Sequence, residues 1–364
     1  MIDQSNGRLL HELQFFNPTL GVVVIEAQSK NEFYDMELPV YKLHTLKVPF
    51  SYVGGLIHSV SLFRQLKDIV RAYDLCVIQL PFVGFLPLLL IRKPTIYHLC
   101  ANVLTASSNP VKYKGMHAIL AKSFAIMMDK SFKILFKRPK TKLICNGLEL
   151  GQLYSKFKPI VTVSSSIYKN EIINFEQVST RTSNLSFIFV GRPSLEKGFD
   201  TLMSALADLR IPFHLFVVGF TQQEFKILLP HAYGLTRHFQ SKITYCGHMG
   251  WDNGLKEILR QVHIGIVPSR SEGTPRVIIE FMSQGVAVIA SRIGGIPGVI
   301  VSGLNGILVE PGNAMQLADT ISQLSLGTEF RNEIVLKGLQ TAHQHTVNEF
   351  ANVFKEAIEQ LTNE

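Results

Sequence analysis

Cysteine is scarce in this 364-residue chain, with four residues at positions 76, 100, 145 and 246. No two of them are close enough in sequence to form a C-x-x-C pair, and none lies in a His/Cys cluster with zinc spacing. We therefore expect four reduced thiols in a reducing compartment and no metal site. The segment Met1–Asn6 has no basic stretch followed by an apolar one, so no signal peptide is predicted.

The chain also lacks an apolar run long enough to suggest a membrane span without interruption. The nearest case is residues 75–91, where two prolines, a glycine and a glutamine break the run. A break after residue 80 predicts instead a buried strand at 75–80 and a short buried helix at 82–91. With a further strand at 95–98, these segments form a βαβ unit whose strands are apolar on both faces.

Charged residues are few, at 18% of the chain, and they are unevenly placed. Residues 1–184 hold 22 Lys+Arg against 12 Asp+Glu, a balance of +10, whereas residues 185–364 hold 14 against 16, a balance of −2. The two balances add to the net charge of +8. The apolar share of 46% excludes wholesale disorder, and the length exceeds one compact core and predicts two domains.

Strands and helices alternate through the second half and are separated by Gly and Pro, which predicts a doubly wound parallel sheet. The expected strands are 187–190, 213–218, 243–246, 264–267, 287–290 and 306–309. The first half is less regular but of the same type, and residues 168–184 show no clear periodicity. The chain also contains no internal repeat and no low-complexity tract.

The predicted fold class is therefore α/β, with two Rossmann-like doubly wound domains that face each other across a central cleft. Residues 1–165 form the first domain, residues 166–184 a linker, and residues 185–345 the second domain. A C-terminal helix at about 346–364 is expected to pack back on the first domain. Ligands of such sheets bind outside the carboxyl ends of the strands, so the loops that follow the strands are the places to search.

The first informative loop is V-G-R-P-S-L-E-K-G at residues 190–198. Its position places Arg192 and Lys197 beside a helix N-terminus, whose free N–H groups favour an anion. Two fixed cations suit a diphosphate, since Arg binds two oxygens at once. The alternative is a solvated loop with an Arg/Glu surface pair. The motifs G-x-G-x-x-G and G-x-x-x-x-G-K-[ST] are absent, which disfavours a nicotinamide dinucleotide site and a P-loop.

The second loop, S-R-S-E-G-T-P-R-V-I-I-E at residues 269–280, follows the strand expected at 264–267. Pro275 fits the first turn of a helix, with Glu272 before it and Glu280 about two turns along. A carboxylate that faces a cleft accepts two vicinal hydroxyls, as a ribose or a hexose presents. Alternatively, Glu272 caps the helix and Glu280 is solvated, although Glu280 stands between two apolar residues.

A third loop, at residues 290–298, is a Gly-rich turn after the next expected strand. It is compatible with a tight connection or with direct ligand contact. Together the three loops resemble those of the family 4 glycosyltransferases, which have the GT-B fold. The match runs in order and at family spacing over about residues 186–325, and it includes V-G-R…E-K-G at 190–198, the E-x7-E pair, V-I-A-S-R-I-G-G-I-P at 288–297 and S-G-L-N-G-I-L-V-E-P-G at 302–312.

The resemblance implies a role for each matching position. Arg192 and Lys197 hold the diphosphate of a nucleotide-sugar donor and stabilise the charge on the leaving group, without a metal or other cofactor. Glu280 binds the donor ribose, and Glu272 contacts the donor sugar near the reacting centre. The other donor-binding positions that it implies are Gly191, Gly247, His248, Gly273 and Thr274. The family retains the anomeric configuration of the transferred sugar.

The sequence departs from the family pattern at three places. Phe281 stands where Ala is usual after the second Glu, and Gly298 where Glu commonly follows Ile-Pro. The first expected element is a helix at 8–16, whereas members of the family usually begin with a strand and a Gly-rich loop. His98, at the end of the strand 95–98, is a candidate for orienting the sugar or acceptor, and the alternative is a core histidine.

The basic charge is concentrated in residues 111–142, which hold nine Lys+Arg and one acid, Asp129. Apolar residues interleave with the cations, and such a stretch suits anionic lipid head groups. The alternative is a solvated helix that packs its apolar side on the first sheet, and nucleic acid is disfavoured because no nucleic-acid module is present. The residues predicted for a membrane or acceptor face are Lys122, Lys130, Lys133, Lys137 and Arg138.

The predicted function is transfer of a sugar, with retention, from a nucleotide-diphosphate-sugar donor to a glycan or lipid-linked glycan. The resemblance implies synthesis of a bacterial surface polysaccharide (lipopolysaccharide, O-antigen, capsule or exopolysaccharide) at the inner face of the cytoplasmic membrane. Two alternatives remain open: a nucleotide-sugar epimerase of the same fold, and a non-catalytic nucleotide-sugar-binding protein.

Overall fold

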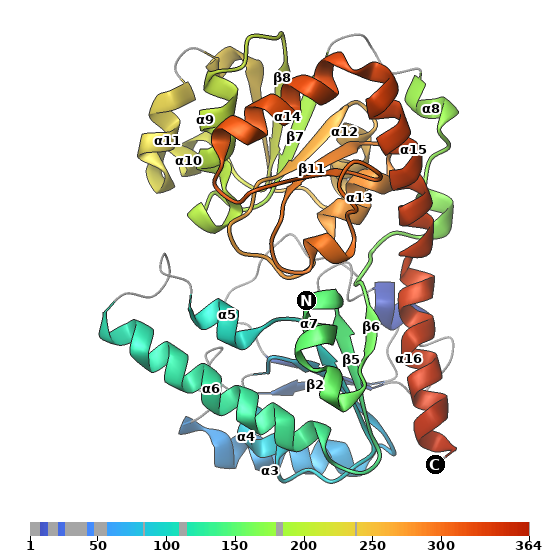
Figure 1. Cartoon of the computed structure of the whole chain (residues 1–364). Coiled ribbons are helices and arrows are strands. Elements are labelled where there is room, and N and C mark those ends of the chain that lie inside the picture. The colour runs from blue at the N-terminus through green and yellow to red at the C-terminus, as the bar shows by residue number, and fades with distance from the viewer. Residues whose placement is uncertain are drawn as a thin grey trace. The chain divides into compact units, whose positions relative to one another are not determined.

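The computed structural model describes residues 8–13, 21–25, 42–46, 57–82, 84–108, 115–179, 185–236 and 239–363 (Figure 1). The chain divides into two compact units. Unit 1 is Met1–Val163 together with Phe350–Glu364, and unit 2 is Ser164–Glu349. The backbone therefore passes between the units twice, after Val163 and after Glu349.

Unit 2 contains one parallel sheet of six strands in the order β12-β11-β10-β7-β8-β9. Counted along the chain from β7, this is the Rossmann order 3-2-1-4-5-6, which confirms the predicted doubly wound sheet. The strands are β7 (Ser186–Val190), β8 (His214–Val218), β9 (Ile243–Gly247), β10 (Ile264–Val267), β11 (Ala287–Ser291) and β12 (Ile307–Val309).

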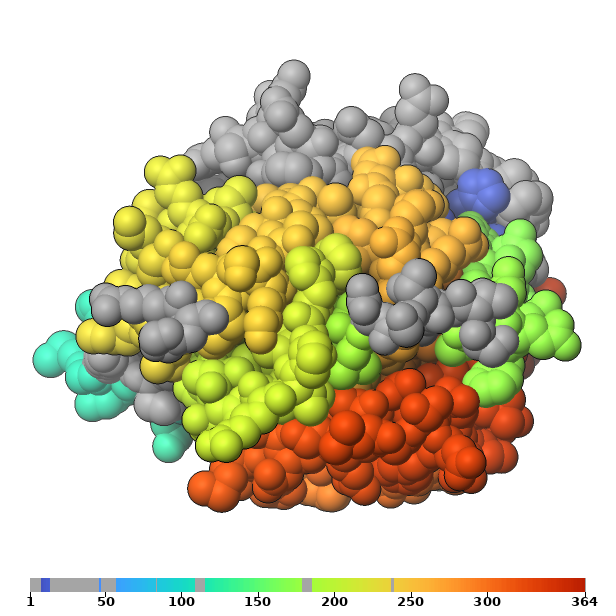
Figure 2. Space-filling model, turned by 90° about the horizontal axis from the view of Figure 1, so that it is seen from above, coloured from blue at the N-terminus to red at the C-terminus, as the bar shows by residue number. Residues whose placement is uncertain are grey.

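Helices lie between successive strands of unit 2 as far as β11, and two more follow β12. They are α9 (Phe199–Ala207), α10 (Gln222–Leu228), α11 (Pro230–Leu235), α12 (Lys256–Leu259), α13 (Val277–Ser283), α14 (Ala314–Leu326) and α15 (Thr328–Gln344). A single turn at Leu195–Lys197 precedes α9, and another at Trp251–Leu255 precedes α12. In the space-filling view the residues of α14, in red-orange, lie along one side of this unit (Figure 2).

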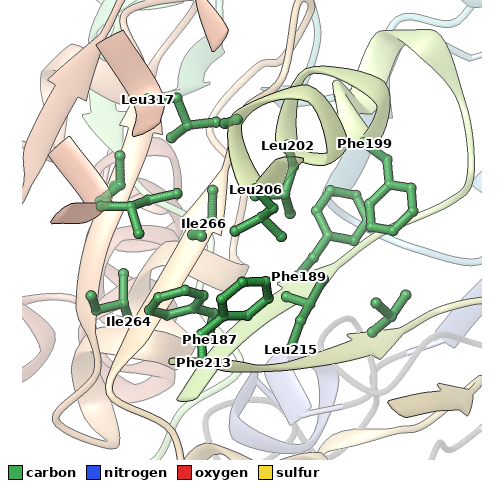
Figure 3. Close-up of a cluster of buried hydrophobic side chains, with 14 of the residues drawn as sticks. Phe187, Phe189, Phe199, Leu202, Leu206, Phe213, Leu215, Ile264, Ile266 and Leu317 are labelled. Atoms are coloured by element: carbon green, nitrogen blue, oxygen red, sulfur yellow. The ribbon is translucent and has the colours of Figure 1, made fainter. Parts of the chain in front are cut away.

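The core of unit 2 is rich in aromatic rings (Figure 3). Phe187 stacks on Phe213 at a centroid distance of 5.5 Å, and Phe199 packs edge-on against Phe220 at 4.9 Å. All residues of β10 and β11 are buried, as expected for central strands of a parallel sheet covered on both faces. This burial fixes the strand ends from which the loops of the site project.

Unit 1 contains a parallel sheet of four strands in the order β3-β4-β5-β6 and a separate parallel pair, β1-β2. The strands are β1 (Gly21–Ile25), β2 (Lys42–Leu46), β3 (Cys76–Leu80), β4 (Thr95–Leu99), β5 (Thr141–Asn146) and β6 (Ile160–Thr162). The helices are α3 (Ser59–Arg71), α4 (Phe85–Leu88), α5 (Val103–Ser107), α6 (Met116–Phe136), α7 (Leu148–Leu153) and, from the far end of the chain, α16 (Val347–Thr362).

The apolar run at residues 75–91 forms strand β3 and the short helix α4, followed by β4, so the predicted βαβ unit is confirmed. The helix is shorter than expected, since it begins at Phe85 rather than at residue 82 and ends at Leu88 rather than at residue 91. Among the described helices, none combines the length and the hydropathy that crossing a membrane requires.

Helix α16 packs on the sheet of unit 1. Its Phe350, Phe354 and Leu361 share one buried cluster with Ile96 of β4 and Ile144 of β5. Residues 8–13 are helical and contribute to the same cluster. Between Val163 and β7, Lys169–Glu171 forms a turn and Glu176–Ser179 a short helix, α8, where the sequence predicted a linker. Ile173 of this segment is buried in the core of unit 2.

Candidate functional site

The strand order of unit 2 places its site. Strands β7 and β10 are neighbours at the centre of the sheet, and the chain winds outward from them in opposite directions. The loops that leave their carboxyl ends therefore diverge and open a crevice at the topological switch point, where ligands of such sheets bind. These are the connections 191–198 and 268–276, which overlap the first two loops that the sequence indicated, 190–198 and 269–280.

The structure brings together one predicted residue from each loop. Lys197 Nζ lies 2.5 Å from Glu272 Oε1, although the two residues are 75 positions apart. The Ser269 hydroxyl donates a hydrogen bond of 2.8 Å to the same carboxylate oxygen. The Lys197 and Glu272 side chains are 25% and 10% exposed, so the pair is largely shielded from bulk solvent.

Close backbone approaches hold these loops in place. Gly198 has a φ of +66°, and a Cβ there would lie 1.9 Å from the Pro268 carbonyl oxygen at the end of β10. Gly294 has a φ of +58°, and its Cβ would lie 2.0 Å from the Glu272 carbonyl oxygen. Gly295 N–H donates to the Gly273 carbonyl at 2.8 Å. The loop of Gly294 and Gly295 therefore packs directly on the loop of Glu272. Of the two interpretations that the sequence left open for these glycines, this packing agrees with a tight connection.

Arg192 and Gly191 follow β7 directly. The Gly191 N–H donates to the Val218 carbonyl of β8 at 3.0 Å, and Gly219 N–H donates to Gly247 of β9 at 2.7 Å, so the ends of three neighbouring strands are joined. The Arg192 side chain is exposed and has no ion pair or hydrogen bond to any residue that the structure describes. Its guanidinium is thus a cation at the crevice with its donors available.

Glu280 lies in α13 and is half-buried. The Ser166 hydroxyl donates a hydrogen bond of 3.0 Å to its Oε1. The neighbouring Phe281 is fully buried, and its ring occupies the space that a Cβ at Gly265 of β10 would need, at 2.2 Å. The larger residue at the position where the family has Ala is therefore accommodated by the missing side chain at Gly265, and it leaves the Glu280 carboxylate unaffected.

The remaining predicted donor-binding residues lie on the same edge of the sheet. Thr274 is buried, and its Oγ1 has no hydrogen-bond partner among the described residues. Gly247 ends β9, and His248 follows it with its side chain exposed. The pKa of Glu224 is lowered by hydrogen bonds from Thr221 and, to a smaller extent, by His248.

Comparison with known proteins agrees with this geometry. The family model of the glycosyl transferases group 1 matches residues 170–340, which contain both loops and the Lys197–Glu272 pair. Residues 170–340 thus match the group 1 glycosyltransferase domain. The sheet order and structural neighbours of this chain show the GT-B type of fold, as the sequence predicted.

Relatives of the group 1 domain are moderately similar in sequence. The glycosyltransferase MJ1178 of Methanocaldococcus jannaschii is 31% identical over 147 residues, which is 40% of each chain, so the match spans less than half of that protein. The lipopolysaccharide core biosynthesis glycosyltransferase LpsE of Rhizobium meliloti is 26% identical over 69% of this chain and 71% of its own. Anabaena Alr3699/HepE, solved with UDP-glucose, superposes with a TM-score of 0.69 at 18% identity, covering all of this chain and 97% of that one.

His98, predicted at the carboxyl end of β4, lies outside the group 1 domain, in unit 1. It is 5% exposed, and its ring packs on Phe350 and Phe354 of α16 at centroid distances of 5.5 and 5.2 Å. Burial lowers its pKa to about 4. This environment is the one expected for the core-histidine alternative, because a neutral ring between two aromatic rings contributes to packing.

Two of the five predicted surface cations have structural partners in unit 1. Arg138 donates to the carbonyls of Leu88, Leu89 and Ile91, where it caps the C-terminal end of α4. Lys133 Nζ lies 2.6 Å from Asp129 Oδ2, and Tyr154 donates to the other oxygen of that carboxylate. The cations exposed on or just after α6 are Lys122, Lys130 and Lys137.

Sequence reasoning missed several residues that shape the site. Ser269, Ser166 and Arg270 make hydrogen bonds at or near the predicted side chains, but only Ser269 and Arg270 lie in a loop that the sequence indicated. Ser166 is remote from Glu280 in sequence, and no motif around it indicates a role in the site. Within the described parts of the chain no group of three or more His, Cys, Asp or Glu side chains is placed to hold a metal ion.

Proposed function

We propose that this protein transfers a sugar from a nucleotide-diphosphate-sugar donor to a glycan or lipid-linked glycan acceptor, with retention of anomeric configuration. The observation that carries the proposal is the Lys197–Glu272 pair at the switch point of the sheet; the loop of Lys197 also carries Arg192, whose side chain has no partner among the described residues. The name of LpsE and the UDP-glucose in the HepE structure support the same reaction class.

The proposed roles follow from the chemistry of the groups. Arg192 binds two diphosphate oxygens with its planar fork, and the Lys197 ammonium still has N–H groups beyond the one that contacts Glu272. As the bond between sugar and diphosphate breaks, negative charge grows on the leaving group, and fixed cations in a partly dry site stabilise it. The Arg192 and Lys197 side chains stabilise the negative charge of the leaving group, so the proposed reaction requires no metal ion.

The two carboxylates are proposed to bind the hydroxyl groups of the donor. Glu280 holds the ribose diol, oriented by its hydrogen bond from Ser166. Glu272 accepts from a hydroxyl of the sugar, since its Oε1 is already occupied by Lys197 and Ser269 while Oε2 remains for the ligand. Gly273 and Thr274 offer backbone N–H groups beside it.

Incubation with a panel of nucleotide sugars tests this function. UDP-glucose, UDP-galactose, UDP-N-acetylglucosamine and GDP-mannose are each incubated with the purified protein, with and without EDTA, and the products are followed by NMR. Slow, EDTA-resistant release of a nucleoside diphosphate, with the sugar first released in the anomeric form of the donor, is expected. Epimerised sugar would identify the epimerase alternative, and binding without any chemistry would identify the non-catalytic alternative.

We further propose that α6 contacts an anionic membrane surface and that the acceptor is lipid-linked, in the synthesis of a bacterial surface polysaccharide at the inner face of the cytoplasmic membrane. The exposed Met116, Ile119 and Leu120 at its start are 76%, 68% and 62% accessible. Lys122 and Lys130 follow along the exposed side of the helix, with Lys137 just after its end. Exposed apolar residues beside lysines are typical of helices that lie in a lipid interface.

Vesicle sedimentation tests this surface. Binding to vesicles that contain phosphatidylglycerol is expected, and replacement of Lys122, Lys130 and Lys137 by Glu should abolish it, since each basic residue near such a surface contributes about 1 kcal/mol. Neutral phosphatidylcholine vesicles and high salt serve as controls. Equal binding of the triple variant, or no binding of the wild type at low salt, contradicts the proposed surface.

A further inference from the structure

Arg270 connects the two loops of the site through its side chain. Its Nη1 donates to the Leu195 carbonyl at 2.8 Å and to Asp200 Oδ1 at 2.6 Å. Its Nη2 donates to Asp200 Oδ2 at 2.8 Å and to Thr201 Oγ1 at 2.7 Å. Two acceptors on each terminal nitrogen use all four of the terminal N–H groups.

The backbone of Arg270 makes a fifth contact, because its N–H donates to the Glu196 carbonyl at 2.7 Å. The residues held by Arg270 lie on both sides of Lys197 in sequence. Arg270 itself is two positions before Glu272 and directly follows Ser269, whose hydroxyl binds the Glu272 carboxylate. The segment that carries the cation and the segment that carries the anion are thus joined by one side chain.

We infer that Arg270 is a positioning residue that fixes Lys197 and Glu272 relative to each other, and that Asp200 is its anchor; this inference rests on the proposed function. Arg270 does not bind the diphosphate, since its terminal N–H groups are consumed by protein acceptors. Arg192, which has no partner among the described residues, is the arginine available to the ligand.

The geometry requires arginine at this position. Two parallel N–H···O bonds to one carboxylate need a planar fork, and the ammonium of lysine is a single point with three N–H groups that cannot reach four acceptors in this plane. The Lys197 ammonium ends a flexible four-carbon stem, so its position depends on how firmly its loop is held. A small displacement of such a group is enough to reduce turnover severely.

The first test measures how well Lys197 is protected from chemical modification, and it does not depend on enzymatic activity. Arg270→Gln, Arg270→Lys and Asp200→Asn are treated briefly with an amine-acetylating reagent, and modification of Lys197 is followed by peptide mass spectrometry. Loss of the hydrogen bonds between Arg270 and the loop of Lys197 should raise the rate of Lys197 acetylation about threefold or more in all three variants. Lys133, which pairs with Asp129 in unit 1, is the internal reference and should keep its rate.

Arg331→Gln is the matched control. The Arg331 guanidinium also holds backbone carbonyls, those of Leu324 and Ser325 at 2.7 and 3.1 Å, but it lies between α14 and α15. This variant should lose thermal stability without any change at Lys197. An unchanged Lys197 rate in Arg270→Gln overturns the inference whether or not the protein proves to be a transferase.

The second test uses the donor that the nucleotide-sugar panel identifies. At a temperature where every variant is folded, Arg270→Gln should lower kcat between about tenfold and a hundredfold, with nucleoside diphosphate affinity little changed. Arg270→Lys should not rescue it. The losses from Arg270→Gln and Lys197→Met should be non-additive, because the first acts through the second. Losses that multiply, or a loss of affinity at unchanged kcat, contradict a positioning role.

Discussion

The carboxyl edges of the two parallel sheets differ in their electrostatics. In unit 2 the loops after β7 and β10 carry a lysine and a glutamate in contact, and the first of these loops also carries Arg192. In unit 1 the end of β4 carries His98, which burial keeps neutral by lowering its pKa to about 4, and the thiol of Cys100 lies 3.5 Å from its Nδ1. The end of β4 therefore carries a neutral ring and a thiol, whereas the loops after β7 and β10 carry charged groups in contact.

The charged groups of unit 2 lie on short loops at the switch point of its sheet, and hydrogen bonds between these loops hold them in place. The excess positive charge of residues 1–184 lies elsewhere, and much of it is on and around α6 at the surface. Net charge by itself therefore did not indicate where the charged site lies.

The largest effect is expected when the Lys197–Glu272 ion pair of unit 2 is removed. Lys197→Met should lower kcat for the donor by about 10²–10³, as expected when a fixed group that stabilises charge on the leaving group is removed. Steady-state kinetics with the donor identified by the panel, together with thermal unfolding, measure the effect.

Lys256→Met is the control for this prediction. Lys256 lies 3.7 Å from Glu171, and the two side chains are 21% and 11% exposed, nearly the same as in the Lys197–Glu272 pair. It should change thermal stability modestly and leave kcat unchanged. A similar loss of kcat in both variants would show that the loss follows from removing any partly buried Lys–Glu ion pair. Lys197 would then have no special role in the reaction.

Strand positions and the site loops could be predicted from the sequence because both depend on local patterns. Buried parallel strands are short apolar runs, and E-x7-E keeps its spacing within one loop and helix. Interactions between distant segments could not be predicted in this way. Arg138 lies among lysines in the sequence, and this local pattern indicated a surface cation. In the structure it donates to carbonyls about 50 residues away and caps α4, which no local pattern indicates.

Helix lengths were also predicted less well than strand positions. Helix α12 begins at Lys256, because the preceding turn at Trp251–Leu255 contains Gly254 with a φ of +105°, which is not helical. Trp251 is fixed there by a hydrogen bond of 2.8 Å from its indole N–H to Glu171. Such tertiary contacts decide where a helix begins, and the apolar periodicity does not encode them.

An intermediate effect is expected at His98, at the end of β4. The pKa of His98 is about 4 in the folded protein and 6.5 when exposed, so the unfolded state binds the proton more readily. The stability that comes from the neutral ring is complete above pH 6.5 and is lost as the pH falls toward 4. At pH 5 this loss is about 2 kcal/mol, and it should be absent in His98→Gln.

Urea unfolding of the two proteins at pH 7 and pH 5 measures this difference, and transfer activity of His98→Ala completes the comparison. Retained transfer is expected for a core histidine, whereas lost transfer with intact donor binding would restore the orienting role that the sequence suggested. A pH dependence that is identical in wild type and His98→Gln would show that the ring is not held neutral by burial.

The smallest effect is expected at Ser166, which tests whether the site of unit 2 is tuned by single hydrogen bonds. Ser166→Ala removes the donor to Glu280 Oε1 at 3.0 Å, and a hydrogen bond of this kind contributes roughly 0.5–1.5 kcal/mol, so affinity for a nucleoside diphosphate should fall about threefold at unchanged kcat. Calorimetric titration measures it. Ser283→Ala is the matched control, because the Ser283 hydroxyl donates to the backbone carbonyl of Glu280 at 2.8 Å rather than to its carboxylate. Stability should fall in that variant without any change in affinity, and equal affinity losses in both would show that Ser166 supports the helix and does not orient the carboxylate.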